Sequence, residues 1–239
     1  MNDRDAHLVG MRSAFAAWEL YAAGTPGAAV RRGSGWTASV FPEGPEAAYL
    51  NNAVLERGLP GGRLAAALDE LELAYAGIDQ YAVWLTDDDH AARARLEARG
   101  YVLDTSTAAM VRELAVRPEV LPYDAGPDTW SAYVEHEGGL LAGVDATAFL
   151  VATASVDGEP VAAALGLPHE GDLGIYNVGT HDRARRRGLA TALTAHLLAK
   201  GFDRGCTTAT LQATPMAERT YARCGFRTVA RILELVPSR

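Results

Sequence analysis

The chain has 239 residues, of which 49% are hydrophobic and 22% are charged. This composition excludes a wholly disordered protein, because it supplies enough apolar surface for a core. The 22 basic and 30 acidic residues give a net charge of -8, opposite to the balance typical of proteins that bind nucleic acid or anionic membranes. Only two cysteines occur, Cys206 and Cys224, which excludes a disulfide scaffold and favours a reducing, cytoplasmic compartment. With no signal-peptide core and no apolar run of about 18 residues, we expect no membrane span.

The first half of the chain predicts alternating helices and strands. A helix is expected near residues 11–22, followed by a hairpin that turns through Gly33-Ser34-Gly35. Later elements follow from apolar spacing and from Gly100, a typical helix-ending residue. They are strands at 48–55, 81–85 and 101–114, and helices at 63–76 and 91–99.

Residues 118–127 interrupt this pattern. Three prolines, Pro118, Pro122 and Pro127, occur there with Gly126 and without clear periodicity. Such a stretch is typical of a linker. We therefore predict one domain at residues 1–117 and a second at residues 128–239.

The second half predicts a β-hairpin followed by alternating strands and helices. Asp157-Gly158 is a strong hairpin turn signal between apolar runs at 148–155 and 160–167. Further strands are expected at 173–180, 206–211 and 226–236, with helices from Gly188 to about residue 200 and at 215–223. The order predicts an α/β half with a mixed sheet.

The two halves share one element order. A shift of 125 residues places Asn52 on Asn177, Gly100 on Gly225 and Tyr101 on Phe226, and it also aligns the Leu and Ala positions of two helices. Helices rich in alanine and leucine align by chance, but chance accounts less well for strands, helices and the Gly-aromatic pair in one register. We therefore predict an internal duplication.

The segment from Asn177 to Thr191 is the most specific stretch of the chain. It predicts a strand, then a turn with four arginines among residues 183–187, then a helix that begins near Gly188. Backbone N–H groups at a helix N-terminus lack intrahelical partners and lie at the positive end of the helix dipole. Small residues such as Gly188 and Ala190 let a phosphate approach the backbone. These residues predict a cradle for a phosphate or pyrophosphate.

The arginine turn also has other interpretations. No Gly-Lys-Ser/Thr triplet and no spaced glycine triplet occur, so a nucleotide P-loop and a dinucleotide fold are disfavoured. A solvated basic turn without a ligand remains open. An RNA-binding arginine cluster also remains open, although no aromatic array flanks the turn.

Two motifs resemble the GNAT N-acetyltransferase superfamily. Residues 185–190, Arg-Arg-Arg-Gly-Leu-Ala, match its Arg/Gln-x-x-Gly-x-Gly/Ala motif, and Ala217, Tyr221 and Gly225-Phe226 match its Ala…Tyr…Gly-Phe segment. The resemblance covers about residues 125–239 and implies acetyl-CoA as co-substrate. It also implies a fold of two tandem GNAT-like domains. The resemblance extends to the first half only through the internal repeat.

The family's roles carry over onto matching positions of this chain. Backbone groups of a splayed strand would bond the pantetheine arm, and the turn and helix start would hold the coenzyme A pyrophosphate. Tyr221 would protonate the leaving thiolate, although a packing role for its ring remains open. Asp182 stands where the family often has proline, and Thr214 where an asparagine often orients the coenzyme. The implied coenzyme A-binding residues are Val178, Gly179, Thr180, Arg185, Arg186, Arg187, Gly188, Leu189, Ala190, Thr191 and Thr214.

The implied reaction is direct attack of an amine on the acetyl-CoA carbonyl, which needs a general base. The candidates are Glu135, His136, Glu137 and Asp145, of which we favour Glu137 beside Gly138-Gly139. The scattered histidines show no metal-ligand spacing, so no metal is expected. The expected acceptor is a small-molecule or peptide amine, and the net charge favours a cationic one such as an aminoglycoside or basic peptide.

The first half lacks the coenzyme A motif. Residues 60–65 read Pro-Gly-Gly-Arg-Leu-Ala at the repeat position of the arginine turn, and Leu96 replaces Tyr221. We therefore predict a degenerate repeat, a pairing known from tandem acetyltransferases of the mycothiol synthase type. The rival function is a non-catalytic module that binds coenzyme A as a sensor or scaffold. A monomer or homodimer is expected, with no nucleic acid or membrane partner.

Overall fold

The computed structural model describes residues 1–42, 49–136 and 141–238. The chain divides into two compact units. Unit 1 comprises Met1–Ala17 and Ala108–Val229, and unit 2 comprises Trp18–Thr107 and Ala230–Arg239. No helix among the described residues is both long enough and apolar enough to cross a membrane.

The two units do not follow the linear division predicted at residues 118–127. Helix α1 (Asp3–Ala23) and strands β5 (Tyr101–Glu113) and β10 (Arg227–Pro237) each run from one unit into the other. The end of β5 pairs with β9 in the second half of the sequence, and the end of β10 pairs with β4 in the first half. Each sheet is thus completed by a strand from the other half of the sequence. A division of the chain into two consecutive domains does not predict this exchange.

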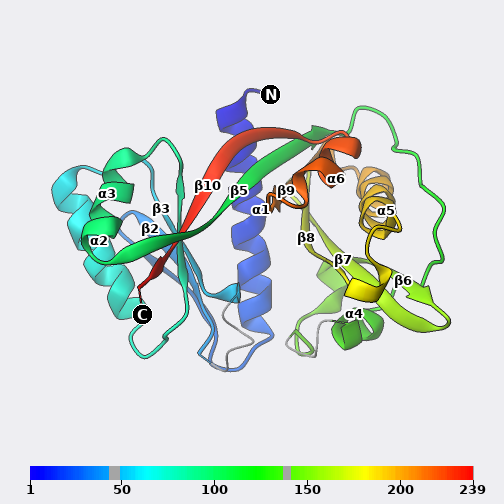
Figure 1. Ribbon diagram of the computed structural model, residues 1–239, viewed down its shortest axis with the longest axis horizontal. Coiled ribbons are helices and arrows are strands. Elements are labelled where there is room, and N and C mark those ends of the chain that lie inside the picture. Colours follow the sequence, from blue (N-terminus) through cyan, green and yellow to red (C-terminus); the bar gives the residue numbers. More distant parts are fainter. Residues whose placement is uncertain (43–48, 137–140, 239) are drawn as a thin grey trace. The chain divides into compact units, whose positions relative to one another are not determined.

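Unit 1 is a five-stranded sheet with helices (Figure 1). The strand order is β5-β9-β8-β7-β6, and neighbouring strands are antiparallel except for the parallel pair β8–β9. The remaining elements of unit 1 are α4 (Trp130–His136), β6 (Leu150–Val156), β7 (Glu159–His169), β8 (Asp172–Thr180), α5 (Leu189–Asp203), β9 (Thr208–Ala213) and α6 (Glu218–Arg223), with 3-10 turns η2 (Ala146–Ala148) and η3 (Asp182–Ala184).

Small residues let α5 pack closely on this sheet. Helix α5 contacts β6, β7 and β8. Its leucines Leu193 and Leu197 share a buried cluster with alanines of β6 and β7, among them Ala152 and Ala164. Because alanine side chains are short, the helix backbone approaches the strands, and apolar burial of about 25 cal/mol per Å² stabilises the contact. This packing holds the middle of α5 against the sheet.

The hairpin between β6 and β7 turns as the sequence predicts. Asp157 and Gly158 have φ angles of 55° and 84°, and the flanking pair is Val156 with Glu159. Two positive φ angles define the type I′ turn that Asp-Gly favours. The 118–127 stretch also contributes to unit 1, because Ala125 forms a bridge with Ala154 along the outer edge of β6.

Unit 2 is a mixed sheet with two helices. Its strands run in the order β1-β2-β3-β4-β10, with the single parallel pair β3–β4. The core contains Leu68, Leu71 and Leu96, each fully buried. The remaining elements are β1 (Ala29–Gly33), β2 (Trp36–Val40), β3 (Asn52–Leu55), α2 (Gly61–Ala74), β4 (Ala82–Thr86) and α3 (His90–Ala98).

The element order in the two halves is the same. Under the shift of 125 residues, α2 overlaps α5, β4 overlaps β9, α3 overlaps α6 and β5 overlaps β10. This supports an internal duplication, which remains a proposal. The element that the sequence did not predict is α4, whose seven residues are too few to show a helical period.

Candidate functional site

The parallel strands β8 and β9 pair over only three residues and then part. Residues 172–174 pair with residues 208–210, whereas β7 accompanies β8 as far as Thr180. In the part of the chain that the structure describes, β8 has no partner in β9 after Gly174. The edge of β8 that carries Val178, Gly179 and Thr180 is therefore not covered by β9.

A bulge in β8 accompanies this separation. Asn177 has a φ angle of +50°, and the register between β7 and β8 shifts between Ala163 and Leu165. Asparagine tolerates the left-handed region better than most residues. Its side-chain amide donates a hydrogen bond of 2.8 Å to the hydroxyl of Tyr133 on α4. The bulge is thus stabilised by the left-handed backbone conformation that Asn177 tolerates and by the hydrogen bond of its side chain.

The equivalent strands of unit 2 remain paired. Asn52, Ala53 and Val54 pair with residues 82–84 of β4. Under the shift of 125 residues they correspond to residues 177–179, where β8 has already left β9. The open strand edge is therefore a feature of the second half only, within the described residues.

The turn after β8 presents backbone donors. Arg186 and Gly188 adopt positive φ angles of 61° and 82°, and α5 begins at Leu189 without a hydrogen bond from a capping side chain. The N–H groups of Leu189, Ala190 and Thr191 therefore lack an intrahelical or capping partner. A side chain at Gly188 would meet nothing within 4 Å, so the approach to these donors is open. Such an arrangement favours an anion.

The arginines of this turn fall into two groups. The Nε of Arg185 donates to the Thr180 carbonyl at 3.3 Å, and its Nη2 lies 2.8 Å from the Asp182 carboxylate. Arg186 and Arg187 are exposed and, among the described residues, have no ion-pair partner. Their charges are free to meet a ligand, as is that of Arg183, which is also exposed and has no ion pair with a described residue.

Tyr221 lies on α6 in the same core cluster against which Val178 and Leu189 pack. Its side chain is only 7% exposed, and its ring lies edge-to-face with Phe226 at 6.2 Å. Burial, followed by the nearby Cys224 thiol, raises the pKa of Tyr221 to about 12. The phenol is therefore protonated at neutral pH and available as a hydrogen-bond donor.

Thr214 lies at the start of the turn between β9 and α6. Its side chain is exposed, and its carbonyl accepts hydrogen bonds from Ala217 at 2.9 Å and Glu218 at 3.1 Å. Its structural role here is thus to begin α6. The expectation that its side chain orients a coenzyme remains a proposal.

The candidates for the general base differ in their surroundings. Glu137, which the sequence favours, lies outside the described residues, and Glu135 is exposed. Asp145 accepts hydrogen bonds from the backbone and hydroxyl of Thr147, which lower its pKa and make it a weak base. His136 is half-buried, and burial followed by the charge of His181 lowers its pKa.

The sequence did not predict two side-chain pairs near the arginine turn. The rings of His136 and His181 stack with centroids 4.4 Å apart. The other pair is Asn177 with Tyr133, which holds the bulge in β8. A positive φ at a non-glycine residue leaves no periodic trace in a sequence, so only the identity of Asn177 could have signalled the kink. The residues that the structure describes contain no group of three or more side chains suited to hold a metal ion.

Comparison with known families identifies the family of the segment that contains this candidate site. The model of the acetyltransferase (GNAT) family matches residues 108–226. Through this segment the chain belongs to the GNAT acetyltransferases. The matched segment contains the parted strands, the arginine turn and Tyr221, so the resemblance identified from the two motifs is confirmed. A search of the curated proteins gives no significant match.

Solved GNAT structures share the fold over most of the chain. A GCN5-related N-acetyltransferase from Kribbella flavida has 22% identity and a TM-score of 0.68, covering 95% of each chain. One from Sphaerobacter thermophilus has 19% identity and a TM-score of 0.61, covering 85% of this chain and 80% of that one. A tandem GNAT protein from the clavulanic acid biosynthesis pathway has 14% identity and a TM-score of 0.56, covering 90% and 86%. The predicted mixed α/β, GNAT-like fold is confirmed.

Proposed function

We propose that the chain transfers the acetyl group of acetyl-CoA to a primary amine by direct attack within a ternary complex. The observation that supports this proposal is that an open strand edge and an uncapped helix N-terminus follow one another in one segment of the GNAT domain. Strand β8 leaves β9 after Gly174 and ends at Thr180, and the uncapped N-terminus of α5 follows the arginine turn at Leu189. The cofactor has an extended pantetheine arm that ends in a pyrophosphate. The amides of the arm need hydrogen-bond partners on a strand edge, and the pyrophosphate needs N–H donors, so the cofactor fits such a segment.

Each part of the cofactor then has a proposed partner. The backbone edge of Val178–Thr180 that β9 leaves open would bond the amides of the pantetheine arm, beside the Thr180 carbonyl that already accepts from Arg185. The N–H groups of Leu189, Ala190 and Thr191 would bind the pyrophosphate, with Arg186 and Arg187 adding charge. Arg185 contributes less, because its guanidinium already bonds Asp182 and the Thr180 carbonyl.

Tyr221 is the proposed donor to the leaving sulfur. A thiol has a pKa of about 8.5, so complete proton transfer from a phenol with a pKa of about 12 is uphill. Tyr221 would therefore stabilise the developing thiolate by donating a hydrogen bond, rather than by giving up its proton early. The sequence predicts that Tyr221 protonates the thiolate, which suits an ordinary tyrosine because its pKa of about 10 lies nearer that of a thiol.

The acceptor amine must lose a proton during the reaction. We propose Glu137 or His136 as the group that takes it, directly or through water. The lowered pKa of His136 keeps its imidazole neutral at neutral pH and so able to accept a proton, while making it a weaker base than an ordinary histidine. The acceptor class, a cationic small molecule or basic peptide, rests on the net charge of -8.

The rival function is a sensor that binds coenzyme A without turnover. A panel of amines with acetyl-CoA, in which the released thiol is measured, separates the two. Transfer to at least one amine, with loss of turnover in Tyr221→Phe, supports the enzyme. Tight binding of acetyl-CoA with no transfer to any amine supports the sensor.

A further inference from the structure

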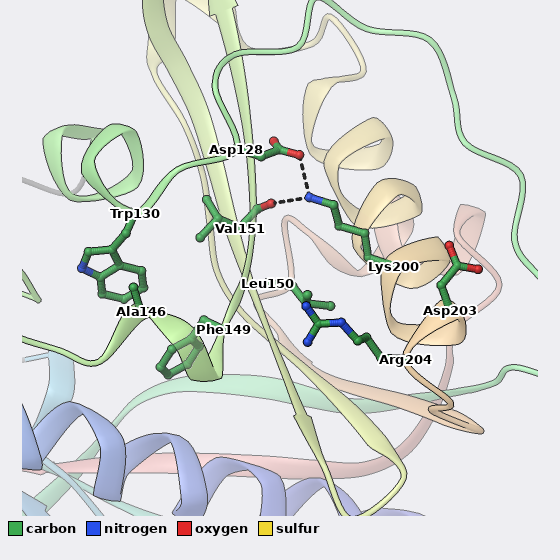
Figure 2. A pocket seen from close by; sticks show the side chains of 9 residues that line it. All are labelled: Asp128, Trp130, Ala146, Phe149, Leu150, Val151, Lys200, Asp203 and Arg204. Carbon is green, nitrogen blue, oxygen red and sulfur yellow. Dashed lines mark hydrogen bonds and ion pairs between the residues drawn. The ribbon is translucent and has the colours of Figure 1, made fainter.

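Unit 1 contains a cavity of about 360 Å³ that the proposed acetyl transfer does not use (Figure 2). It lies where α5 ends and the edge strand β6 begins. One part of its wall is apolar and the other is charged. The residues that matter for its chemistry are Trp130, Phe149, Val151, Lys200, Asp203 and Arg204.

The cavity lies far from the arginine turn. Lys200 comes 11 residues after Leu189 in α5, which at 1.5 Å per residue places it roughly 17 Å along the helix axis. Because α5 connects the parallel strands β8 and β9, it runs back toward Asp172, the end of β8 opposite to Thr180. A ligand in this cavity is therefore separate from the proposed coenzyme A site.

The lining side chains Asp128, Asp203, Lys200 and Arg204 carry two negative and two positive charges, but Arg117 from outside the lining also pairs with Asp203 and leaves one positive charge in excess. The Nζ of Lys200 lies 2.6 Å from the Asp128 carboxylate, and Arg117 donates two hydrogen bonds of 2.8 Å to Asp203. Both carboxylates are therefore compensated. The guanidinium of Arg204 has no hydrogen bond or ion pair with any described residue, and Figure 2 shows the side chain extending past Leu150. One positive charge remains available to a ligand.

Two further donors accompany that charge. The ammonium of Lys200 has three N–H donors, of which Asp128 and the Val151 carbonyl, at 3.1 Å, take two. Strand β6 supplies the other donor. Both backbone groups of Thr153 face the outer edge of the sheet, because its N–H bonds Asp128 and its carbonyl bonds Gly126. Val151, two residues earlier, faces the same way, and its N–H has no partner among the described residues.

The apolar part of the wall suits a flat molecule. The rings of Trp130 and Phe149 lie 5.6 Å apart with an interplanar angle of 32°. Aromatic walls of this kind favour stacking with another planar ring. A volume of about 360 Å³ lies within the range of small-molecule sites.

We propose that this cavity binds a small aromatic monocarboxylate. The carboxylate would bond the guanidinium of Arg204, with Lys200 and the Val151 N–H as additional donors, and the ring would lie against Phe149 and Trp130. One negative charge on the ligand balances the one uncompensated positive charge. The site does not depend on acetyl transfer, so it stands or falls separately from the proposed function.

The sequence offers a direct reporter for the test. Lys200 is the only lysine of the chain, so lysine labelled with nitrogen-15 gives a single backbone amide signal, from a residue that lines the cavity. The full chain is titrated with 2-naphthoate. We expect a saturable shift with a dissociation constant below about 1 mM, and no shift with the cationic analogue 2-naphthylmethylamine.

Matched variants assign the binding to the cavity. Arg204→Gln should weaken binding at least about tenfold, whereas Arg204→Lys keeps the charge and part of the affinity. Arg95→Gln, an equal change of charge on the exposed face of α3, should leave binding unchanged. Thermal melting of each variant shows whether it is folded. The proposal is overturned if 2-naphthoate gives no saturable shift, if the amine binds equally well, or if folded Arg204→Gln binds like the parent.

Discussion

The side-chain amide of Asn177 donates a hydrogen bond of 2.8 Å to the hydroxyl of Tyr133, which is fully buried on α4. Asn177 also has a φ angle of +50°, at a bulge in the part of β8 that has no partner in β9. The pair therefore connects α4 to the open strand edge. Because that edge is where we place the pantetheine arm, the hydrogen bond should affect both stability and coenzyme binding.

Tyr133→Phe tests this connection. The substitution removes the hydroxyl and leaves the Asn177 amide without its partner, so we expect a loss of about 1–2 kcal/mol in the free energy of unfolding. We also expect weaker binding of acetyl-CoA, because the bulge is less well held. Chemical denaturation and calorimetry measure the two effects.

A second tyrosine provides the matched control. The hydroxyl of Tyr176 is buried and has no hydrogen-bond partner within the described residues. Its removal in Tyr176→Phe should therefore leave stability unchanged or slightly increased. Equal losses in the two variants would show that the Asn177 contact has no special role.

Arg186→Gln and Arg187→Gln should each weaken acetyl-CoA binding by about three- to tenfold, because each removes one charge-assisted contact to the pyrophosphate. Arg185→Gln should have a smaller effect, since its guanidinium already bonds Asp182. Calorimetry at two salt concentrations measures this, and screening should reduce the difference at high salt. Arg95→Gln serves as the charge control, and an equal effect there would argue against a local site.

Tyr221→Phe should lower turnover by at least about a hundredfold while acetyl-CoA affinity and stability stay near the parent values. The hydroxyl has no hydrogen bond to a described residue, so its removal costs little stability. The raised pKa of about 12 keeps the phenol protonated through the neutral and moderately alkaline range. Turnover should therefore show no alkaline loss from Tyr221 below about pH 11. Unchanged turnover in the variant would remove the proposed donor role.

We expect the free energy of unfolding to fall in mild acid because of His136. Burial, then the charge of His181, lowers the pKa of His136 below its ordinary value of 6.5 in the folded state. The unfolded chain then binds more protons, so stability falls as pH falls through 6.5 toward the folded pKa. His136→Gln should flatten this part of the profile, measured as melting temperature from about pH 5 to 8. His90→Gln, an exposed change on α3, should not.

Much of the fold could be predicted because its signals are local. Asp157-Gly158 fixes a two-residue turn by its own φ angles, and the leucine spacing of α5 defines a buried face. The exchange of β5 and β10 between the units could not be predicted. Strand pairing at that distance depends on tertiary packing, and the composition of the strands is the same whichever sheet they join.

The candidate site shows the same limit. Backbone chemistry at the start of α5 follows from Gly188 and its neighbours, so the sequence sufficed to locate it. The pKa of Tyr221 did not follow, because burial in the core, rather than the motif, raises it. Nor did the Asn177–Tyr133 contact, which joins residues 44 positions apart.

Calorimetric titration of the full chain with acetyl-CoA tests directly whether the second half binds this cofactor. We predict saturable binding of one molecule per chain, because among the described residues only the second half has the parted strands and the arginine turn. We also predict a loss of affinity in the Arg186→Gln, Arg187→Gln double variant. Absence of binding at millimolar acetyl-CoA would rule out the proposed coenzyme A site, and two equivalent sites per chain would rule out its restriction to the second half.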